Sequence, residues 1–363
     1  MKLESIILND FFNILNQKQI NYCVMNNYIN MPELIPTDVD FTIEYKDYQK
    51  LDSLVESLAN KHNVYVTQKI WHGYNKCAYI LSPLDIDTYF WLQLDFFVDF
   101  SANGYPNLLP ASKMLSSKVK YKNFYIPSPE IEVPFILQRR IFKCDFKDEH
   151  LKTLLNLYKD NEAKVNKSLE EIFGFEISKI LINVIVNKDL ELFTTNYSLL
   201  NKYLKTVSNN NTNLIYSTKY YLSQLIRTIY RVYYPNSISI QLLGKPTDEL
   251  KKVSIDIDDL ISGSFHGTST IKINSLSSYY KQYLKKVLIP KITKRKVFIL
   301  SNKYNIEESL LIKILGTSAN ITIDLNVEKD FKKIIFNIMK TQNKQTMKHL
   351  YSVLSPTSKK RNF

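Results

Sequence analysis

The sequence predicts an α/β protein with more than one folded unit. The chain has 363 residues, which exceeds the usual size of one domain and favours two or three domains. Up to about residue 130, several short runs alternate apolar with polar residues, as half-buried strands do. After residue 236, short apolar runs alternate with helical patterns, which indicates a parallel sheet with crossover helices.

The composition fits folded domains in a reducing compartment. Hydrophobic residues make up 45% of the chain, which is enough to fill proper cores. Cys23, Cys77 and Cys144 are scattered and lack the spacing of metal ligands, which favours a cytoplasmic location. The net charge of +13 has two explanations, an anionic partner or simply a basic proteome.

The beginning of the chain predicts an amphipathic helix. Apolar residues recur at helical spacing over residues 3–15, and Glu4 and Asp10 interrupt any run that could act as a signal peptide. The sequence has no uncharged apolar stretch of about 18 residues, so a membrane span is not expected. A peripheral membrane contact stays compatible with the sequence.

The first unit continues as strands and helices in alternation. We expect strands at residues 20–25, 36–43, 64–68, 77–81 and 91–99. Residues 47–62 carry an apolar stripe at helical spacing, which would cover one face of the sheet. Lys69 and His72 are expected in a loop between two strands. Ser128 is a suitable N-cap, and Pro129 suits the first position of the helix that follows.

The strand at residues 36–43 places two carboxylates on one side. Side chains alternate along a strand, so Asp38 and Asp40 point the same way. Carboxylates this close repel each other unless a cation lies between them, and hard oxygen ligands suit Mg²⁺, with Mn²⁺ as the alternative ion. Asp95 on a neighbouring strand would complete a two-metal site. Asp99 has the same parity but lies roughly 13 Å further along the strand, too far to share the ion.

The order of three short motifs resembles the DNA polymerase β type nucleotidyltransferase superfamily. The motifs are the turn Asn26-Asn27, the pair Asp38-Val39-Asp40 in a strand, and Leu94-Asp95-Phe96 in a second strand. With Ser128-Pro129-Glu130, they are similar to a bacterial branch often encoded near surface-glycan genes, and the resemblance covers residues 1–165.

The resemblance implies a reaction and roles for the three acids. The family transfers NMP from an NTP to a hydroxyl or phosphate, here of a small-molecule or glycan-precursor acceptor, and releases pyrophosphate. Asp38 and Asp40 would hold both metal ions. Asp95 would hold the ion on the nucleophile side and help to deprotonate the acceptor.

The nucleotide-binding turn departs from the family pattern. The family usually has Gly-Ser or Gly-Gly there, because a missing Cβ lets backbone N–H groups approach the triphosphate. Asn26 and Asn27 stand in this chain instead; asparagine tolerates positive φ, and its amide can donate to phosphate. Arg140 and Lys143, on the following helix, are the expected basic ligands of the triphosphate. The alternative for these two residues is a solvated helix face.

Residues 166–235 are expected to form a helical extension. Helical periodicity runs through residues 151–174 and 177–204. A polar break at 208–213 precedes a tyrosine-rich helix at 214–234. We expect these tyrosines to pack between helices rather than to stack on nucleic-acid bases.

Residues 236–355 are similar in their order of elements to the thymidylate-kinase branch of P-loop kinases. We expect strands at 238–243, 296–300 and 321–327 and a helix at 279–289. The family's chemistry has largely gone. Gly244-Lys245-Pro246-Thr247 lacks the second glycine and the Lys-Ser/Thr pair of a P-loop. Ser301-Asn302-Lys303-Tyr304 stands where those kinases have Asp-Arg-Tyr. We therefore expect a domain that neither binds ATP tightly nor phosphorylates nucleotides.

Two basic segments and two other functional classes complete the expectations. The lysine-rich run at residues 281–296 is expected to be a solvated helix and loop face rather than to bind a polyanion or lipid headgroups, and the basic tail at 356–363 is expected to be disordered. The chain could be a non-catalytic scaffold or binding protein with two decayed nucleotide sites. It could also modify nucleic-acid ends, which the charge favours but which needs a basic groove. Convergence of the three acids around one cavity would favour the catalytic hypothesis.

Overall fold

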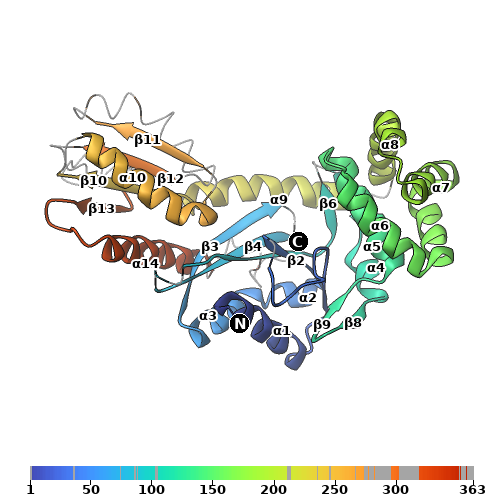
Figure 1. The fold of residues 1–363 in the computed structure, drawn as a ribbon, viewed down its shortest axis with the longest axis horizontal. Helices are drawn as coiled ribbons and strands as arrows, with labels where there is room; N and C mark the ends of the chain where they lie inside the picture. The colour runs from blue at the N-terminus through green and yellow to red at the C-terminus, as the bar shows by residue number, and fades with distance from the viewer. Residues whose placement is uncertain are drawn as a thin grey trace.

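The structure is a computed structural model of the chain, drawn as a ribbon in Figure 1. It describes residues 2–35, 37–73, 75–85, 87, 89–102, 105–210, 214–234, 236–244, 247–265, 267–273, 277, 282, 296–301, 319–350, 352 and 357. These residues form a mixed sheet and a separate parallel sheet with helices around them, so the α/β prediction is confirmed at this level.

The N-terminal sheet has five strands in the order β1-β2-β5-β4-β3. Their bounds are β1 (Tyr22–Val24), β2 (Asp38–Ile43), β5 (Leu92–Phe97), β4 (Lys76–Pro83) and β3 (Val64–Gly73). β2 and β5 are parallel, whereas the other neighbours are antiparallel. Helices α1 (Leu3–Gln17), α2 (Tyr45–Tyr48) and α3 (Leu51–Lys61) lie below the sheet in the view of Figure 1.

An aromatic core fills the space between this sheet and α1. Phe41 of β2 stacks on Phe96 of β5 with ring centroids 4.8 Å apart. Phe11 of α1 meets both rings edge-on, at 5.7 and 5.9 Å. Because side chains alternate along a strand, the same strands carry Asp40 and Asp95 on their opposite face.

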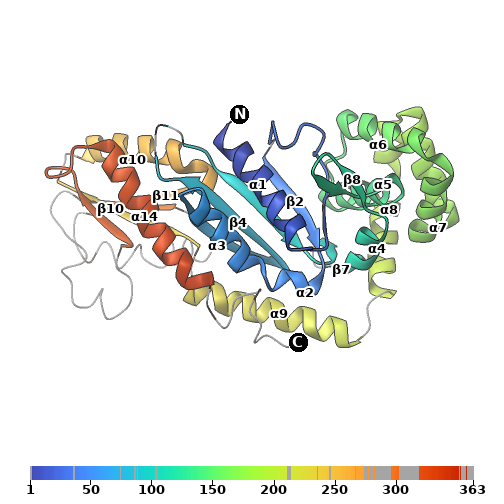
Figure 2. The same ribbon diagram turned by 90° about the horizontal axis from the view of Figure 1, so that it is seen from below.

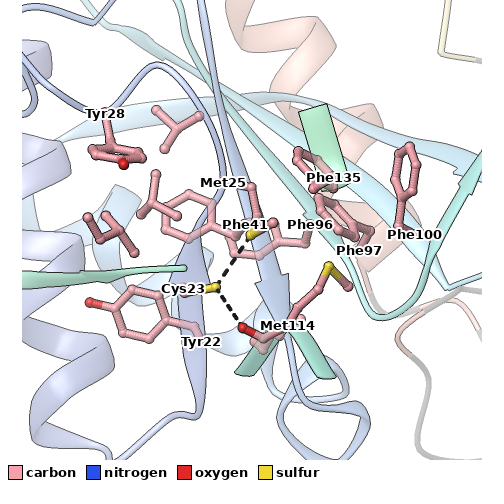
Figure 3. Close-up of a cluster of buried hydrophobic side chains, with 14 of the residues drawn as sticks. Tyr22, Cys23, Met25, Tyr28, Phe41, Phe96, Phe97, Phe100, Met114 and Phe135 are labelled. Carbon is pink, nitrogen blue, oxygen red and sulfur yellow. Dashed lines mark hydrogen bonds between the residues drawn. The ribbon is translucent and has the colours of Figure 1, made fainter. Parts of the chain in front are cut away.

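Helix α5 (Pro129–Lys143) packs on that opposite face. Phe135 of α5 stacks on Phe97 of β5, with ring centroids 6.1 Å apart, and meets Phe100 at 4.8 Å (Figure 3). The helix follows Ser128 and begins with Pro129, as its sequence predicts. Its inward residues therefore lie next to the acidic side of the sheet.

Two hairpins and four helices continue the chain. The hairpins are β6 (Phe100–Ala102) with β7 (Tyr105–Leu109), and β8 (Val119–Tyr121) with β9 (Phe124–Ile126); α4 (Ala111–Ser116) lies between them. The helices are α6 (Asp148–Asp160), α7 (Glu162–Asn187), α8 (Leu190–Asn210) and α9 (Leu214–Tyr233). The helix boundary expected after residue 174 is confirmed as a kink within α7, because Gly174 has non-helical backbone angles, a φ of 70° and a ψ of 165°, between two helical segments. A Cβ there would lie 2.8 Å from the Tyr203 hydroxyl.

The C-terminal sheet is parallel throughout, in the order β11-β12-β10-β13. Its strands are β10 (Ile238–Leu243), β11 (Thr268–Lys272), β12 (Lys296–Ser301) and β13 (Ile321–Asp324). Helix α10 (Thr247–Ile261), the 3₁₀ turn η2 (Ser262–Ser264) and helix α14 (Phe331–Leu350) accompany them. The helix expected at 279–289 and the two basic segments lie outside the described residues, apart from Gln282, Lys296 and Thr357.

Helix α14 joins this second unit to the edge strand β3 of the first sheet. The Val66 N–H donates to Asn343 Oδ1 at 3.1 Å, and Thr346 Oγ1 donates to the Thr67 carbonyl at 2.9 Å. Helix α9 also contacts β3 and extends from the α7 and α8 side toward the second sheet (Figures 1 and 2). Of the helices in the described part of the chain, none is long and apolar enough to cross a bilayer.

Strand β3 corrects one expectation about polar residues. It extends to Gly73, five residues beyond the expected end, so Lys69 and His72 lie in the strand rather than in a loop. Lys69 is fully buried and forms an ion pair with Asp52 of α3 at 2.5 Å. Tyr79 donates to the same carboxylate at 2.8 Å. The backbone hydrogen bonds of the sheet and the Asp52 partner of the buried Lys69 together explain the longer strand. Hydrophobic periodicity alone does not reveal these contacts.

Candidate active site

Three carboxylates converge on the open face of the first sheet. Asp40 and Asp95 lie directly opposite each other in the parallel register of β2 and β5, and Asp38 precedes Asp40 by two residues on the same side. Each offers an oxygen atom, and these oxygens all lie within 4.8 Å of one another. Asp40 is 6% and Asp95 5% exposed, whereas Asp38 is half-buried. The cluster is therefore open on the Asp38 side only.

Neighbouring groups orient the carboxylates. Thr37 Oγ1 donates to Asp38 Oδ1, and Gln93 Nε2 donates to Asp95 Oδ1, each at 2.8 Å. Arg139 Nη1 of α5 donates to Asp40 Oδ2 at 2.5 Å. Each acid thus has a hydrogen-bond partner that fixes one of its oxygens and leaves the other for a cation.

The electrostatics of the cluster favour a bound cation. Burial raises the pKa of Asp95 to about 6, and the Asp40 and Asp38 charges act in the same direction against Lys76 and Gln93. Burial opposes the charge on Arg139, but the Asp40, Asp38 and Asp95 carboxylates raise its pKa above the usual value. One guanidinium therefore faces three acids, and a divalent cation would satisfy the remaining charge.

The turn after β1 has the backbone that the sequence analysis required. Asn26 and Asn27 have φ values of 75° and 53°, in the left-handed region that glycine usually occupies. The turn adjoins the acids, because the Met25 N–H donates to the Asp40 carbonyl at 2.8 Å. Asparagine thus occupies a conformation here that glycine usually adopts.

A hollow of about 380 Å³ opens beside this turn. Its lining is Asn26, Asn27, Ile29, Asn30, Leu34, Ile136, Arg140, Glu149, His150 and Thr153. Arg140 Nη1 donates to Asp145 Oδ2 at 2.8 Å, which holds the guanidinium at the edge of the hollow. Burial and the Arg140 charge lower the pKa of His150. The hollow therefore combines amide donors, a guanidinium and an imidazole beside the Asn26-Asn27 turn, while Asp38, Asp40 and Asp95 are not among the residues that line it.

The structure places the remaining candidates outside the cluster. Lys143 is exposed near the end of α5 and does not line the hollow. Burial of its stem and the Arg139 and Arg140 charges lower its pKa, while Asp40 opposes them. Asp99 lies beyond β5 and accepts the Ala111 N–H at 2.9 Å at the start of α4. It lines a different hollow, of about 490 Å³, beside α4.

Sequence reasoning missed Arg139 and His150 as members of this region. Arg139 does have a sequence signal, because the inward residues of α5 follow the spacing Glu132, Phe135, Arg139, Phe142, which points toward the sheet. His150 lies in the first turn of α6, and only the tertiary packing of α6 beside the Asn26 turn brings it near the site.

In the second unit, side chains of the protein lie beside the end of β10, where a nucleotide-binding loop would follow the strand. Leu243 ends β10 and Thr247 begins α10, so only three residues connect them. Gly244 has a φ of 88°, and the side chains of Asp324 and Asn326 occupy the space where a Cβ would lie. In an open α/β sheet a ligand would bind at this end of the first strand, and here protein atoms take that space.

Comparison with known proteins adds no relative. The chain matches no family model, no curated protein and no solved structure. The assignment of a function therefore depends on the geometry of the site and on the motif resemblance.

Proposed function

We propose that this chain is an Mg²⁺-dependent nucleotidyltransferase of the DNA polymerase β type. It would transfer NMP from an NTP to a hydroxyl or phosphate of a small-molecule or glycan-precursor acceptor. The observation that carries the proposal is the convergence of the Asp38, Asp40 and Asp95 oxygens within 4.8 Å. Three acids on two neighbouring strands, two of them buried, are costly without a cation.

The donor set suits Mg²⁺. All three ligands are hard carboxylate oxygens on rigid strands, the chemistry that Mg²⁺ prefers. Asp38 and Asp40 would hold two ions, and Asp95 would hold the one on the acceptor side. When bound, the ions would neutralise phosphate charge and orient the attacking and leaving oxygens for in-line transfer.

The protein groups would bind the NTP and prepare the acceptor. The left-handed Asn26-Asn27 turn would direct its backbone and side-chain N–H groups at the triphosphate. Arg140 would contribute a bidentate guanidinium beside the turn. Asp95, as the carboxylate on the acceptor side, would help to deprotonate the acceptor. Attack on the α-phosphorus would then release pyrophosphate.

The second unit fits a supporting role in this proposal. Its parallel sheet supports the resemblance to thymidylate kinases. Its first turn is short and filled by Asp324 and Asn326, which supports loss of the nucleotide loop. We place the chemistry of the protein in the first unit, within residues 1–165.

A pyrophosphate-release assay with each of the four NTPs and Mg²⁺ tests the proposal. The wild-type chain should release pyrophosphate with at least one NTP, and Asp40→Ala should abolish release and Mg²⁺-dependent NTP binding while the circular dichroism spectrum is retained. Asp87→Ala is the matched control, because Asp87 is an exposed carboxylate that pairs with Lys332. Turnover in Asp40→Ala equal to wild type would refute the assignment. NTP binding without turnover would indicate the scaffold function.

A further inference from the structure

Trp91 is an exposed aromatic residue on the acidic side of the first sheet. It immediately precedes β5, and side chains alternate along a strand, so Trp91, Gln93 and Asp95 point the same way. Gln93 lies opposite Asp38 in the register and donates to Asp95, which places this row on the side of the acidic cluster. Trp91 therefore lies beyond Asp38, where the cluster is open, and about 13 Å along the strand direction from Asp95.

The second unit holds the Trp91 ring in place. A Cβ on Gly263 of η2 would collide with the Nε1, Cδ1 and Cε2 atoms of the Trp91 indole, so the absence of a side chain lets the two units come this close. Tyr89, two residues before Trp91, packs against the core of the second sheet. Trp91 nevertheless stays 40% exposed. The protein thus fixes one part of the ring and leaves another part open to solvent.

The Asn26-Asn27 turn and Trp91 lie on different sides of the three acids. The turn follows β1, which pairs with one edge of β2, whereas Trp91 precedes β5, which pairs with the other edge. In the proposed function the turn binds the triphosphate and the acids hold the ions beside the α-phosphorus. The nucleoside end then extends away from the turn, toward β5. An exposed indole there offers a flat apolar surface on which a nucleobase can stack.

We infer that Trp91 binds the nucleobase of the NTP by stacking, and that Gly263 of the second unit positions the ring for this contact. The inference rests on the proposed function, because it takes the acidic cluster as the site of the α-phosphate. It gives the second unit a part in substrate binding that needs no nucleotide loop of its own. Every nucleobase has a flat face, so the contact should strengthen binding of each of the four NTPs.

Titration calorimetry of the full chain with Mg²⁺ tests the role of Trp91. Two probes are compared: inorganic tripolyphosphate, which lacks a nucleoside, and whichever of the four NTPs binds most tightly. Trp91→Ala should weaken NTP binding about tenfold and leave the tripolyphosphate affinity unchanged, whereas Trp91→Phe keeps a flat ring and should retain most of the NTP affinity. Circular dichroism verifies that both variants fold. Tyr221→Ala, at a 68% exposed position of α9, is the matched control and should bind both probes as the wild type does.

A double-mutant cycle tests the role of Gly263. Gly263→Ala displaces the indole, so it should weaken NTP binding in the wild-type background and have no further effect in Trp91→Ala. Gly73→Ala is the matched control, because nothing lies within 4 Å of a Cβ at that position. Additive losses from Gly263→Ala and Trp91→Ala would show that Gly263 does not act through the ring, and would overturn its positioning role.

The two probes separate this inference from the proposed function. If the wild-type chain binds both probes equally, or if Trp91→Ala leaves NTP affinity unchanged, the inference is overturned and the proposed function stands. Equal losses of both probes in Trp91→Ala also overturn it, because Trp91 would then support the acidic cluster rather than the nucleobase. A wild-type chain that binds neither probe with Mg²⁺ would contradict the proposed function and the inference together.

Discussion

At the residue scale, Asp95 and Asp99 have different roles although both lie at the same parity near the end of one strand. Asp95 lies opposite Asp40 within the cluster, whereas Asp99 caps the start of α4. We therefore expect Asp95→Asn to reduce turnover on the order of 10²-fold or more, because it removes a metal ligand. Asp99→Asn should have a much smaller effect, since an amide oxygen still accepts the Ala111 N–H. Steady-state pyrophosphate release measures both, and equal losses would contradict the placement of the site.

Arg139 supplies a second prediction at this scale. Its guanidinium donates to Asp40, so a divalent cation must share or displace that contact. Arg139→Ala should therefore tighten Mg²⁺ binding in the absence of nucleotide, by roughly tenfold, the worth of one charged hydrogen bond of about 1.5 kcal/mol. Titration calorimetry with MgCl₂ measures the affinity directly.

The matched control for that titration is Arg140→Ala. Arg140 pairs with Asp145 rather than with the cluster, so its removal should leave Mg²⁺ affinity unchanged. An Mg²⁺ affinity that falls in Arg139→Ala would mean that the guanidinium orients Asp40 instead of competing with the ion.

The sequence was informative about single residues where strand alternation applied. Parity alone placed Asp38 and Asp40 on one side, and the two strands then brought Asp95 to them. It carried a signal for Arg139 in the spacing of the inward residues of α5, but it did not show that this arginine meets Asp40, because that contact joins a helix and a strand far apart in the chain. It misplaced Lys69, because a fully buried lysine requires a partner, Asp52, that no local pattern predicts.

At the element scale, α5 carries a buried acid that gives the fold a pH dependence. Glu132 is buried, and Tyr28 donates to it at 2.6 Å. Burial raises its pKa to about 7, against the opposing effect of the Tyr28 hydrogen bond. Between the unfolded value of about 4.3 and this value, the folded state holds a proton that the unfolded state has released. The contribution of Glu132 to stability therefore falls as pH rises through that window.

Substitution of Glu132 by glutamine should remove this dependence. The amide still accepts the Tyr28 hydrogen bond but does not titrate, so the free energy of unfolding of Glu132→Gln relative to wild type should increase between about pH 5 and pH 8. Urea unfolding at both pH values measures it. Glu170→Gln, at an exposed position of α7, should give the same difference from wild type at both. A Glu132→Gln difference that does not change with pH would show that the acid is ionised throughout.

Elements were predictable where the local pattern was strong. The expected strand at residues 238–243 matches β10, and Pro129 does begin α5. Gly174 was expected to end a helix, and its non-helical φ and ψ do separate two helical segments within α7. A boundary failed where tertiary contacts decide it: β3 extends past its apolar run because β4 pairs with it over its full length.

At the scale of the whole molecule, the sequence separated two units but gave no sign of how they join. The joining contacts include polar side chains of α14 that bond to backbone groups of β3, such as Asn343 to the Val66 N–H, and the aromatic pair Tyr65 and Phe336. Such residues look like an ordinary polar helix face in the sequence. The join covers an edge strand that would otherwise expose unpaired N–H and C=O groups.

This join predicts local protection that depends on α14. Asn343→Ala should remove the acceptor of the Val66 N–H and speed its exchange with deuterium, with a loss of stability of about 1 kcal/mol. Amide exchange resolved at Val66 measures the effect. Asn337→Ala on the same helix lines a different hollow, next to β13, and should leave Val66 protection unchanged. Unchanged Val66 exchange in Asn343→Ala would show that α14 does not protect this edge.

The join also decides how the second unit should be tested for ATP binding. An isolated fragment beginning at residue 236 would expose the side of α14 that packs on β3, so the full chain is the proper sample.

In the double variant Asp38→Ala with Asp40→Ala the first site cannot hold its ions, and any remaining affinity for Mg²⁺ and ATP belongs to the second unit. We expect no micromolar binding in titration calorimetry and no phosphorylation of thymidylate. The reason is that the connection after β10 lacks the second glycine and the Lys-Ser/Thr pair of a P-loop, and that the Asp324 and Asn326 side chains lie where a Cβ on Gly244 would be. Micromolar affinity in the double variant would mean that the turn opens and that the second unit still recognises nucleotides.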